Sequence, residues 1–387
     1  MWRECTDRLQ RTRRGKSMLL RAISFAAAAA FSTATVGNSH RAALSMPCIV
    51  AEDKFLKIPP DRFLGDVSAV SVDTKGMIWV LHRPRTLLAE QREQALPPVV
   101  KFGPDGALNG GFGGPDSSYE WPTVEHSLAV ASNGHVWISG SFRNDAAQAD
   151  DMILEFTNEG KFVRQIGRRG ASQGNRDKAN VHAPGDLAID SRRGEIYVAD
   201  GYGNRRVVVF DAASGAHLRS WGAFGSPPTT DAAPPPRTAG KPFSKEVGDG
   251  PPDFNGVHGV ALSHDGTVYV SDRNNQRIQA FTRSGKFLSQ IFIDRNLRSA
   301  TTASGIAFSD DAEQRYMFVA DFGNEVIVVV DRRGMSVIGR IGTGAGNGPA
   351  LTTPHLIASD GGGHLFVSEV AARRVRRLTI KHQCADD

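Results

Sequence analysis

Residues 257–281 have the sequence VHGVALSHDGTVYVSDRNNQRIQAF, and the chain continues with TRSGKFL. The run GVAL is followed by an Asp-Gly turn and by TVYV, and a polar group then leads into RIQAF, a Ser-Gly turn and a further apolar run. Alternating apolar and polar residues between glycine-containing turns are typical of short antiparallel strands. The stretch therefore predicts one four-stranded unit.

Five other segments repeat this pattern, starting near residues 66, 125, 184, 303 and 354. They are VSAVSVDTKGMIWVLHR, EHSLAVASNGHVWISG, PGDLAIDSRRGEIYVADGYGNRRVVVF, ASGIAFSDDAEQRYMFVADFGNEVIVVV and TPHLIASDGGGHLFVSEVAARRVRRL. A repeat of roughly 50–70 residues with four short strands is the signature of propeller blades around a central channel. We predict an all-β, six-bladed β-propeller over residues 54–380, followed by a tail at 381–387.

The composition agrees with such a fold and excludes some partners. The chain of 387 residues contains 41 glycines and 20 prolines, as expected for many short strands and turns. The formal charge of +5 owes much to the first 22 residues, which carry six arginines and one lysine, and the rest is close to neutral. Nothing therefore suggests nucleic-acid binding. We expect a monomer that acts on a small molecule or a peptide.

The first 45 residues have the features of a targeting segment and linker. A basic stretch leads into the apolar ISFAAAAAF and then into small residues. This apolar run is shorter than the ~20 residues that a spanning helix needs, so no membrane span is expected in the mature chain. We predict export to the periplasm or the extracellular space, with a mitochondrial presequence as the alternative. Either Met1 or Met18 could be the start.

Two further features lie at the margins of the predicted propeller. Cys48 and Cys384 flank it, and the sequence leaves open whether they form a bridge or remain free thiols. Residues 225–253 form a Pro- and Gly-rich insertion that is too long for an ordinary connection. The insertion precedes the blade of His258, so it could overhang the channel mouth.

One position of the repeat alternates between histidine and a small residue. In chain order it holds Ser68, His126, Gly185, His258, Ser304 and His355. Alternate blades of a six-membered ring are about 120° apart, so three imidazoles can converge in the channel while the small residues leave space between them. Three histidines with an open fourth position are typical of catalytic zinc. The alternative is that each histidine hydrogen-bonds a neighbouring backbone carbonyl and joins the blades.

This constellation resembles the peptidyl-α-hydroxyglycine α-amidating lyase family, whose members are six-bladed propellers of NHL type with a catalytic zinc in the channel. The resemblance is most specific in VSAVSVDTKGMIWVLHR, ADGYGNRRVVVF and VHGVALSHDGTVYVSDRNNQRIQAF. It implies that the three histidines are zinc ligands. It further implies that Tyr202 in DGYGN is the catalytic tyrosine, and that Arg83 and Arg273 are arginines of the active site.

The chemistry of that family suits these residue types. Its substrate is a carbinolamide next to a carboxylate, and breaking the C–N bond yields an amide and glyoxylate. A zinc ion polarises the hydroxyl group. A cation such as Arg83 favours the phenolate form of a tyrosine base, and the planar fork of arginine suits a carboxylate.

The chain also departs from the family around this set. The resemblance places calcium ligands at the carbonyls of Val70 and Leu128, but Leu356 stands where the family has an aspartate. A hard cation would lose its only charged ligand, which argues against calcium. Thr353 replaces a methionine, and His182 and Gly203 occupy the places of a family disulfide. These departures suggest related chemistry on another substrate.

Three functions follow from these observations. The first is a zinc-dependent lyase that cleaves a small carbinolamide. The second is a non-catalytic NHL propeller that binds a protein, peptide or glycan, since fold alone does not determine function. The third is a metal-dependent, lactonase-like hydrolase, although such channels usually hold calcium on acidic and amide ligands that this ring lacks.

Overall fold

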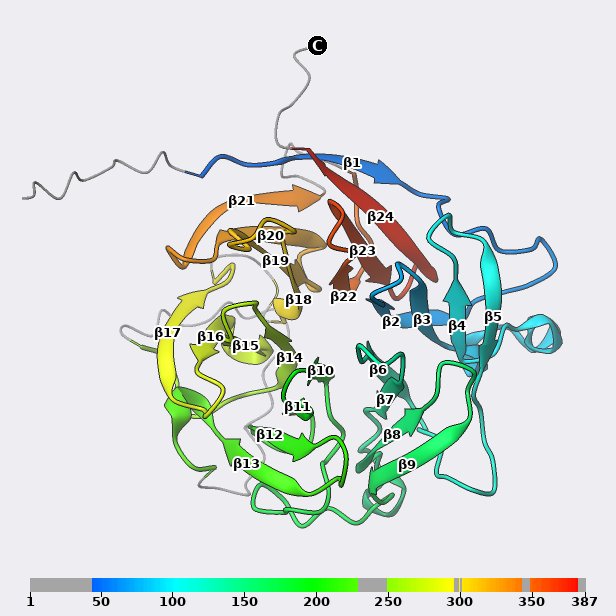
Figure 1. Cartoon of the computed structure of the whole chain (residues 1–387), viewed down its shortest axis with the longest axis horizontal. Helices are drawn as coiled ribbons and strands as arrows, with labels where there is room; N and C mark the ends of the chain where they lie inside the picture. Colours follow the sequence, from blue (N-terminus) through cyan, green and yellow to red (C-terminus); the bar gives the residue numbers. More distant parts are fainter. Residues whose placement is uncertain (1–43, 229–248, 296–298, 300, 343–348, 382–387) are drawn as a thin grey trace, which may run out of the picture. The chain divides into compact units, whose positions relative to one another are not determined.

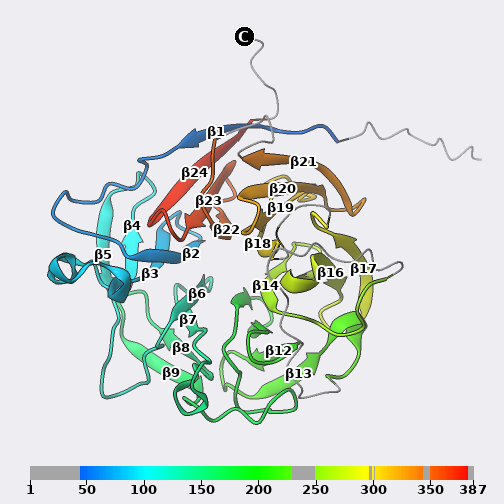
Figure 2. The same cartoon turned by 180° about the vertical axis from the view of Figure 1, so that it is seen from behind.

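Short strands of the chain pair into six four-stranded antiparallel sheets, which are arranged as blades around a central axis (Figures 1 and 2). The computed structural model describes residues 44–228, 249–295, 299, 301–342 and 349–381. All the strands belong to the unit that begins at Leu44. The predicted six-bladed β-propeller is therefore confirmed. The predicted targeting segment up to residue 43, most of the 225–253 insertion and nearly all of the tail lie outside the described residues.

In every blade the first strand named below lies innermost, and in blades one to five the fourth lies outermost (Figure 1). Blades one and two contain β2 (Asp66–Val72), β3 (Ile78–Arg83), β4 (Val99–Phe102) and β5 (Leu108–Phe112), and β6 (Glu125–Val130), β7 (Val136–Gly140), β8 (Met152–Phe156) and β9 (Phe162–Gly167). Blades three and four contain β10 (Asp186–Asp190), β11 (Glu195–Asp200), β12 (Arg206–Asp211) and β13 (His217–Trp221), and β14 (Val257–Leu262), β15 (Val268–Asp272), β16 (Arg277–Phe281) and β17 (Phe287–Phe292). Blades five and six contain β18 (Ala303–Phe308), β19 (Tyr316–Asp321), β20 (Val326–Asp331) and β21 (Ser336–Gly342), and β22 (Pro354–Ser359), β23 (His364–Glu369) and β24 (Arg374–Lys381).

The ring closes with a strand from the beginning of the described chain. β1 (Cys48–Glu52) pairs antiparallel with β24 and completes the sixth sheet, so this sheet combines both ends of the described chain (Figure 1). β1 lies before residue 54, where the sequence placed the start of the propeller. Cys48 is disulfide-bonded, and Cys384, for which the sequence left a bridge to Cys48 open, lies outside the described residues.

The hydrophobic core lies between neighbouring blades. Each second strand has a sheet neighbour on both sides and a blade on both faces, and β11 and β19 are buried along their whole length. Tyr197 and Val209 of blade three, for example, share one apolar cluster with Val260 and Val270 of blade four. Burial of apolar surface therefore stabilises the ring as a whole rather than each blade separately.

The connections between second and third strands differ in length around the ring. In blades three to six they are short turns, such as η5 (Arg273–Asn275). Blade one has a long connection with η1 (Pro84–Thr86) and η2 (Ala89–Gln94), and blade two has residues 141–151 with η3 (Ala146–Gln148). A further 3-10 turn, η4 (Ala223–Gly225), follows β13. Because the strands of each sheet alternate in direction, these connections all lie on the face of the propeller at which the innermost strands begin.

Two of the short turns are held by the same buried motif. Asp200 at the end of β11 accepts hydrogen bonds from Asn204 (2.8 Å) and Arg206 (2.8 Å). Asp272 at the end of β15 accepts equivalent bonds from Asn275 (2.8 Å) and Arg277 (2.8 Å). A buried charge is stable only when it is paired and hydrogen-bonded in this way. The motif therefore fixes the turns that carry the predicted site residues Tyr202 and Arg273.

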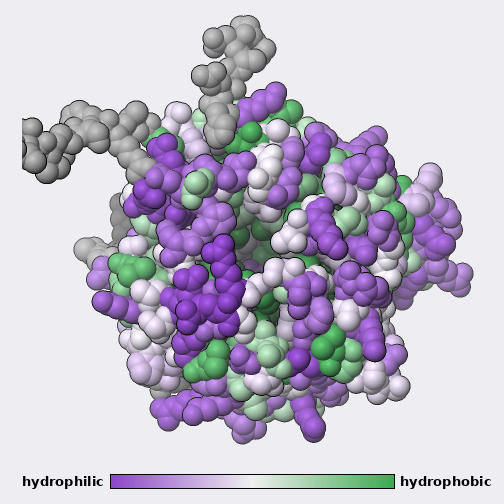
Figure 3. All heavy atoms as spheres, in the orientation of Figure 1, coloured by the Kyte–Doolittle hydropathy of each residue, from purple (hydrophilic) through white to green (hydrophobic). Residues whose placement is uncertain are grey.

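Polar side chains dominate the face of the propeller drawn in Figure 3, and its centre is hollowed where the innermost strands meet. Among the described residues, no helix is long and apolar enough to cross a membrane.

Candidate metal centre

The three histidines of the ring converge on one point. His126 of β6, His258 of β14 and His355 of β22 are all buried, and a potential ligand atom of each lies within 4.8 Å of those of the other two. Their ring centroids are 5.1, 4.7 and 4.8 Å apart, which is close to an equilateral triangle. The threefold arrangement predicted from alternate blades is therefore present in the structure.

Backbone carbonyls of the neighbouring blades orient two of these rings. The Nδ1 of His126 is 2.7 Å from the carbonyl oxygen of Gly185, and the Nδ1 of His355 is 2.6 Å from that of Ser68. A carbonyl accepts only, so Nδ1 carries the proton and each Nε2 presents its lone pair to the centre. This tautomer, with its second nitrogen bonded to a carbonyl, is the usual one for histidine that binds a metal.

The third ring is less tightly held. The Ser304 carbonyl faces His258 and favours its protonated form, but the buried Nδ1 of His258 has no hydrogen bond of normal geometry among the described residues. Its Nε2 lies 3.1 Å from the Nε2 of His355. Two lone pairs at that distance repel one another unless a proton or a metal cation lies between them. Nitrogens bound to one tetrahedral zinc at 2.0–2.1 Å are about 3.3 Å apart, so the spacing of this pair suits two ligands of one metal ion.

All three imidazoles are held in the neutral form that a metal requires. Burial lowers the pKa of His126 and His258 well below the ordinary value, and it lowers the pKa of His355 to about 3. The nearby guanidinium groups of Arg83 and Arg273 lower the pKa values of His126 and His355 further, and Arg273 also lowers that of His258. A neutral imidazole does not have to lose a proton before it binds a cation. The residues present therefore fit a zinc ion.

The small residues between the histidines have a role other than the predicted one. They were expected to leave space between the imidazoles, but Gly185 packs against the next blade: a Cβ here would lie 2.6 Å from the carbonyl oxygen of His258. A side chain would push β10 away from β14. The alternation thus allows close approach of the inner strands, and the carbonyls of Gly185 and Ser68 orient the histidines.

The predicted tyrosine and one predicted arginine lie directly beside the triad. The Tyr202 hydroxyl is 3.0 Å from the Nε2 of His126, and Nη1 of Arg273 donates to this hydroxyl over 3.1 Å. The guanidinium carbon of Arg273 is also 5.1 Å from the centroid of the Tyr202 ring. The Nε of Arg273 is buried without a hydrogen-bond partner among the described residues. This donor is free to bind a ligand.

Arg83 reaches the same space from the end of β3. Its Nε donates to the carbonyl oxygen of Glu125 over 2.8 Å, which fixes the side chain beside the entrance of β6. Burial lowers the pKa of Arg83, and the charge of Tyr202 counteracts this effect. The preceding His82 bonds the amide of Gly65 (3.0 Å) and the carbonyl of Pro97 (3.0 Å), so it holds the strand end in place.

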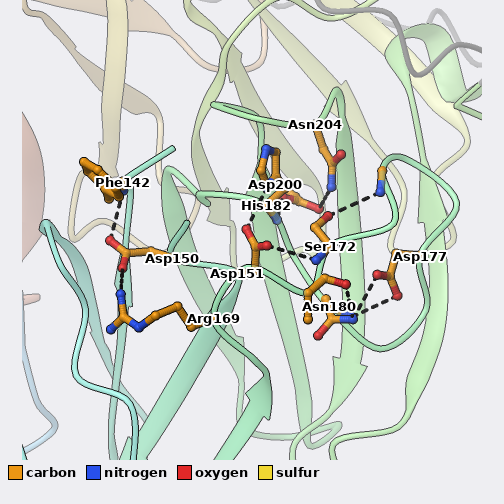
Figure 4. Close-up of polar contacts among 12 residues, drawn as sticks. Phe142, Asp150, Asp151, Arg169, Ser172, Asp177, Asn180, His182, Asp200 and Asn204 are labelled. Carbon is orange, nitrogen blue, oxygen red and sulfur yellow. Dashed lines mark hydrogen bonds and ion pairs between the residues drawn. The ribbon is translucent and has the colours of Figure 1, made fainter. Parts of the chain in front are cut away.

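His182 and Gly203 lie against each other, as the resemblance implied for the positions of a family disulfide. A Cβ on Gly203 would lie 1.6 Å from Cδ2 of His182, so the imidazole fills the place of a side chain there. The Nδ1 of His182 lies 2.6 Å from a carboxylate oxygen of Asp151, and the backbone amide of His182 donates to the Asp200 carboxylate over 2.8 Å (Figure 4). A hydrogen-bonded histidine thus connects blade two to the turn of Tyr202.

Two histidines of the triad, His126 and His355, line a cavity of about 300 Å³ that also contains a residue missed in the sequence. Arg143, in the 141–151 connection, has its guanidinium carbon 4.8 Å from the centroid of the Tyr202 ring. The sequence feature that could have indicated Arg143 is the length of this connection, because the later blades have only short turns at the same place. The cavity is lined by Arg83, Val124, His126, Ser141, Phe142, Arg143, Asn144, Tyr202, Arg273, Phe322, His355 and Val370.

The residues considered for calcium lie at the other end of the channel. Val70, Leu128 and Leu356 line a second cavity of about 460 Å³. Leu356 and Leu128 share an apolar cluster, so no carboxylate stands at the predicted aspartate position. A carboxylate from another blade, Asp186, lines the cavity and accepts hydrogen bonds from the Ser127 hydroxyl (2.6 Å) and the Leu187 amide (2.8 Å). Burial raises its pKa to about 6.

A family model described as "NHL repeat" matches residues 182–210 and 254–281, which include most of the strands of blades three and four. NHL repeat-containing protein 3 from Homo sapiens is 25% identical over 331 residues, or 82% of this chain and 80% of that protein. Peptidyl-glycine alpha-amidating monooxygenase from Mus musculus is 27% identical over 221 residues, or 54% of this chain but only 20% of that protein. A probable peptidyl-alpha-hydroxyglycine alpha-amidating lyase from Caenorhabditis elegans is 24% identical over 263 residues, or 66% of this chain and 64% of that protein.

Solved structures show the same fold at lower identity. A streptogramin B lyase is 13% identical, covers 87% of this chain and 99% of its own, and has a TM-score of 0.50. A protein of unknown function from Bacteroides thetaiotaomicron is 12% identical, covers 87% and 76%, and has a TM-score of 0.53. The chain is thus an NHL-repeat propeller that is distantly related to amidating monooxygenases and lyases.

Proposed function

We propose that this protein is a zinc-dependent carbon–nitrogen lyase that cleaves a carbinolamide to an amide and glyoxylate. The observation that carries the proposal is the joint placement of three neutral, buried histidines and the Tyr202 hydroxyl, which lies 3.0 Å from the Nε2 of His126. A binding propeller would not need this set. The relatives named as amidating enzymes support the same chemistry, although the identity to them is low.

The reaction is a proton transfer coupled to bond cleavage. The carbinol hydroxyl loses its proton, its oxygen forms a double bond to carbon, the C–N bond breaks, and the amide nitrogen gains a proton. No water or oxidant is consumed. A zinc ion held by the three histidines would supply a Lewis acid for the hydroxyl group.

The residues of the chain have distinct tasks in this reaction. Tyr202 is placed to accept the hydroxyl proton, because its own hydroxyl borders the centre of the triad. Arg273 donates a hydrogen bond to the Tyr202 oxygen and so holds this oxygen beside the triad. Arg83, on the wall of the same cavity, is available to bind the substrate carboxylate.

The test is the release of products from a simple substrate. Wild-type protein with bound zinc is incubated with N-benzoyl-α-hydroxyglycine, and benzamide and glyoxylate are quantified against the uncatalysed reaction. The proposal predicts equimolar products at a rate that depends on zinc. If zinc-loaded protein releases neither product above the uncatalysed rate from this compound or from its acidic analogues, the lyase assignment is wrong.

We also propose that the protein works outside the cytosol. The basic and apolar segment before residue 45 motivates this view. The disulfide bond at Cys48 supports it, because structural disulfides persist mainly in oxidising compartments. Fractionation of the cells that express the full chain tests the proposal, and recovery of the protein only in the cytosol would contradict it.

A further inference from the structure

The cavity beside the triad has more positive charge than one substrate carboxylate requires. Three arginines line it, namely Arg83, Arg143 and Arg273, whereas none of its lining residues is an aspartate or glutamate. None of the three guanidinium groups forms an ion pair with a carboxylate in the described parts of the chain. Like charges in one small cavity repel one another, and an anionic ligand would relieve this repulsion.

Arg143 is held at this position by its own loop. The amide of Phe142 donates to Oδ2 of Asp150 over 2.9 Å, and the amide of Asp150 donates to the carbonyl of Phe142 over 2.8 Å (Figure 4). The buried Asp150 carboxylate also accepts hydrogen bonds from the amides of Thr123 (2.8 Å) and Val124 (3.0 Å). The two ends of the loop are therefore fastened together next to the start of β6.

The loop is also fastened to blade three. The amide of Ala183 donates to the carbonyl of Asp150 over 3.1 Å, and Asp151 pairs with His182. The same region supports Tyr202, whose amide donates to the carbonyl of Ala183 over 3.3 Å. Arg143 and Tyr202 are thus positioned by one continuous network. The Arg143 side chain itself is exposed at the mouth of the cavity, so its charge is available to a ligand.

We propose that the natural substrate carries a second acidic group and that Arg143 binds it. This inference rests on the proposed function, which assigns the first carboxylate to Arg83 and leaves Arg273 bonded to the Tyr202 hydroxyl. One carboxylate is bound fully by one or two guanidinium forks, which leaves the outermost cation without a partner. The second group, a carboxylate or a phosphate, would extend from the amide side of the substrate toward the mouth. Arg143 would then determine specificity without touching the reacting atoms.

The test uses ligands that lack the hydroxyl group and cannot be cleaved. N-succinylglycine carries two carboxylates, whereas N-succinamoylglycine has the same size and only one. Calorimetry on the zinc-loaded wild type should show about tenfold tighter binding of the dianion at low ionic strength, since hydrogen bonds between charged groups are the strong ones. The preference should shrink as salt is added. N-(3-phosphonopropanoyl)glycine replaces the second carboxylate by a phosphonate. If it binds more tightly than N-succinylglycine, the second group of the natural substrate is a phosphate; if it binds more weakly, that group is a carboxylate.

Two variants assign the effect to one side chain. Arg143→Gln should lose the preference for the dianion and bind N-succinamoylglycine as the wild type does. Arg192→Gln removes the same charge from an exposed turn at the opposite end of β10, and it should keep the preference. Equal binding of both ligands by the wild type, or an unchanged preference in Arg143→Gln, would overturn the inference.

Failure of the inference is distinguishable from failure of the proposed function. If the preference is found but no hydroxylated compound releases glyoxylate, the anion site stands and the lyase assignment is wrong. If glyoxylate is released from singly and doubly charged substrates with the same kcat/KM, the lyase assignment stands and the role of Arg143 is wrong.

Discussion

The central channel has two ends that are built from the same six innermost strands, and their side chains differ in kind. At the end where these strands begin, a cavity of about 300 Å³ is lined by His126, His355, Tyr202 and three arginines, and His258 completes the triad beside it. At the end where they finish, a larger cavity of about 460 Å³ is lined mainly by small and apolar residues, with Asp186 among them.

The difference shows how one scaffold separates function from packing. The connections between second and third strands lie at the end with the three histidines, and they vary in length and sequence from blade to blade. The other end receives the short turns within each first pair of strands, which repeat the same pattern. Variable loops on a rigid scaffold are the usual place for binding residues. Substitutions at the histidine end should therefore change zinc binding and activity. Substitutions at the other end should change stability.

The largest expected effect is the loss of zinc when one ligand is removed. His258→Ala should reduce bound zinc from about one per chain to almost none and abolish activity, because two histidines do not complete the site. His264→Ala is the matched control, since His264 lies at the other end of the channel and lines the larger cavity. Metal analysis of both purified variants checks this. Loss of zinc in both would mean that the two ends are not independent.

The next effect concerns the proton transfer alone. Tyr202→Phe should retain zinc and lower kcat by about 10²–10⁴, the usual contribution of a general base. Tyr316→Phe is the control, because its hydroxyl bonds the carbonyl of Ser45 far from the triad, and it should keep full activity. Glyoxylate release measures both. An unchanged kcat in Tyr202→Phe would remove this residue from the reaction.

A smaller effect is expected from the support of Tyr202. Gly203→Ala places a methyl group where His182 packs, since the two would be 1.6 Å apart. We expect destabilisation by about 1–3 kcal/mol, as for other overpacked sites, and roughly tenfold lower kcat with zinc retained. Adding His182→Ala should restore part of the stability by opening space. If the double variant is less stable than Gly203→Ala, the collision is not the cause.

The smallest effect concerns Asp186, which lines the larger cavity, and depends on pH. Burial raises the pKa of Asp186 from 3.8 to about 6, so the folded state holds this proton more tightly than the unfolded state. The stabilisation that comes from this bound proton is complete below pH 4 and is lost as pH rises through 6. The free energy of unfolding should fall by about 1–3 kcal/mol over this range. Asp186→Asn should remove this part of the pH dependence and leave zinc binding unchanged. Denaturant unfolding at pH 4, 5, 6 and 7 measures it, and identical slopes in both proteins would contradict it.

The sequence predicted the parts of the site that repeat. Blade starts at 66, 125, 257, 303 and 354 are also the first residues of innermost strands, because apolar alternation and turn residues are local signals. The convergence of the histidines followed from the symmetry of the ring. The sequence did not reveal the carbonyls that orient them, because every residue has a carbonyl and only packing decides which one meets an imidazole.

The parts that do not repeat could not be predicted in this way. Arg143 lies in a long connection without a counterpart in blades three to six, and contacts of Asp150 and Asp151 with distant segments determine its position. β1 closes the ring through pairing with β24, more than 300 residues along the chain. Such contacts depend on tertiary structure and leave no periodic pattern in the sequence.

The zinc site is the central claim, and X-ray absorption at the zinc edge tests it most directly. Protein purified without added metal should contain about one zinc per chain, with three imidazole nitrogens at about 2.0–2.1 Å and one oxygen ligand from solvent. Folded protein that neither contains nor takes up zinc, or zinc bound without imidazole, would contradict the account.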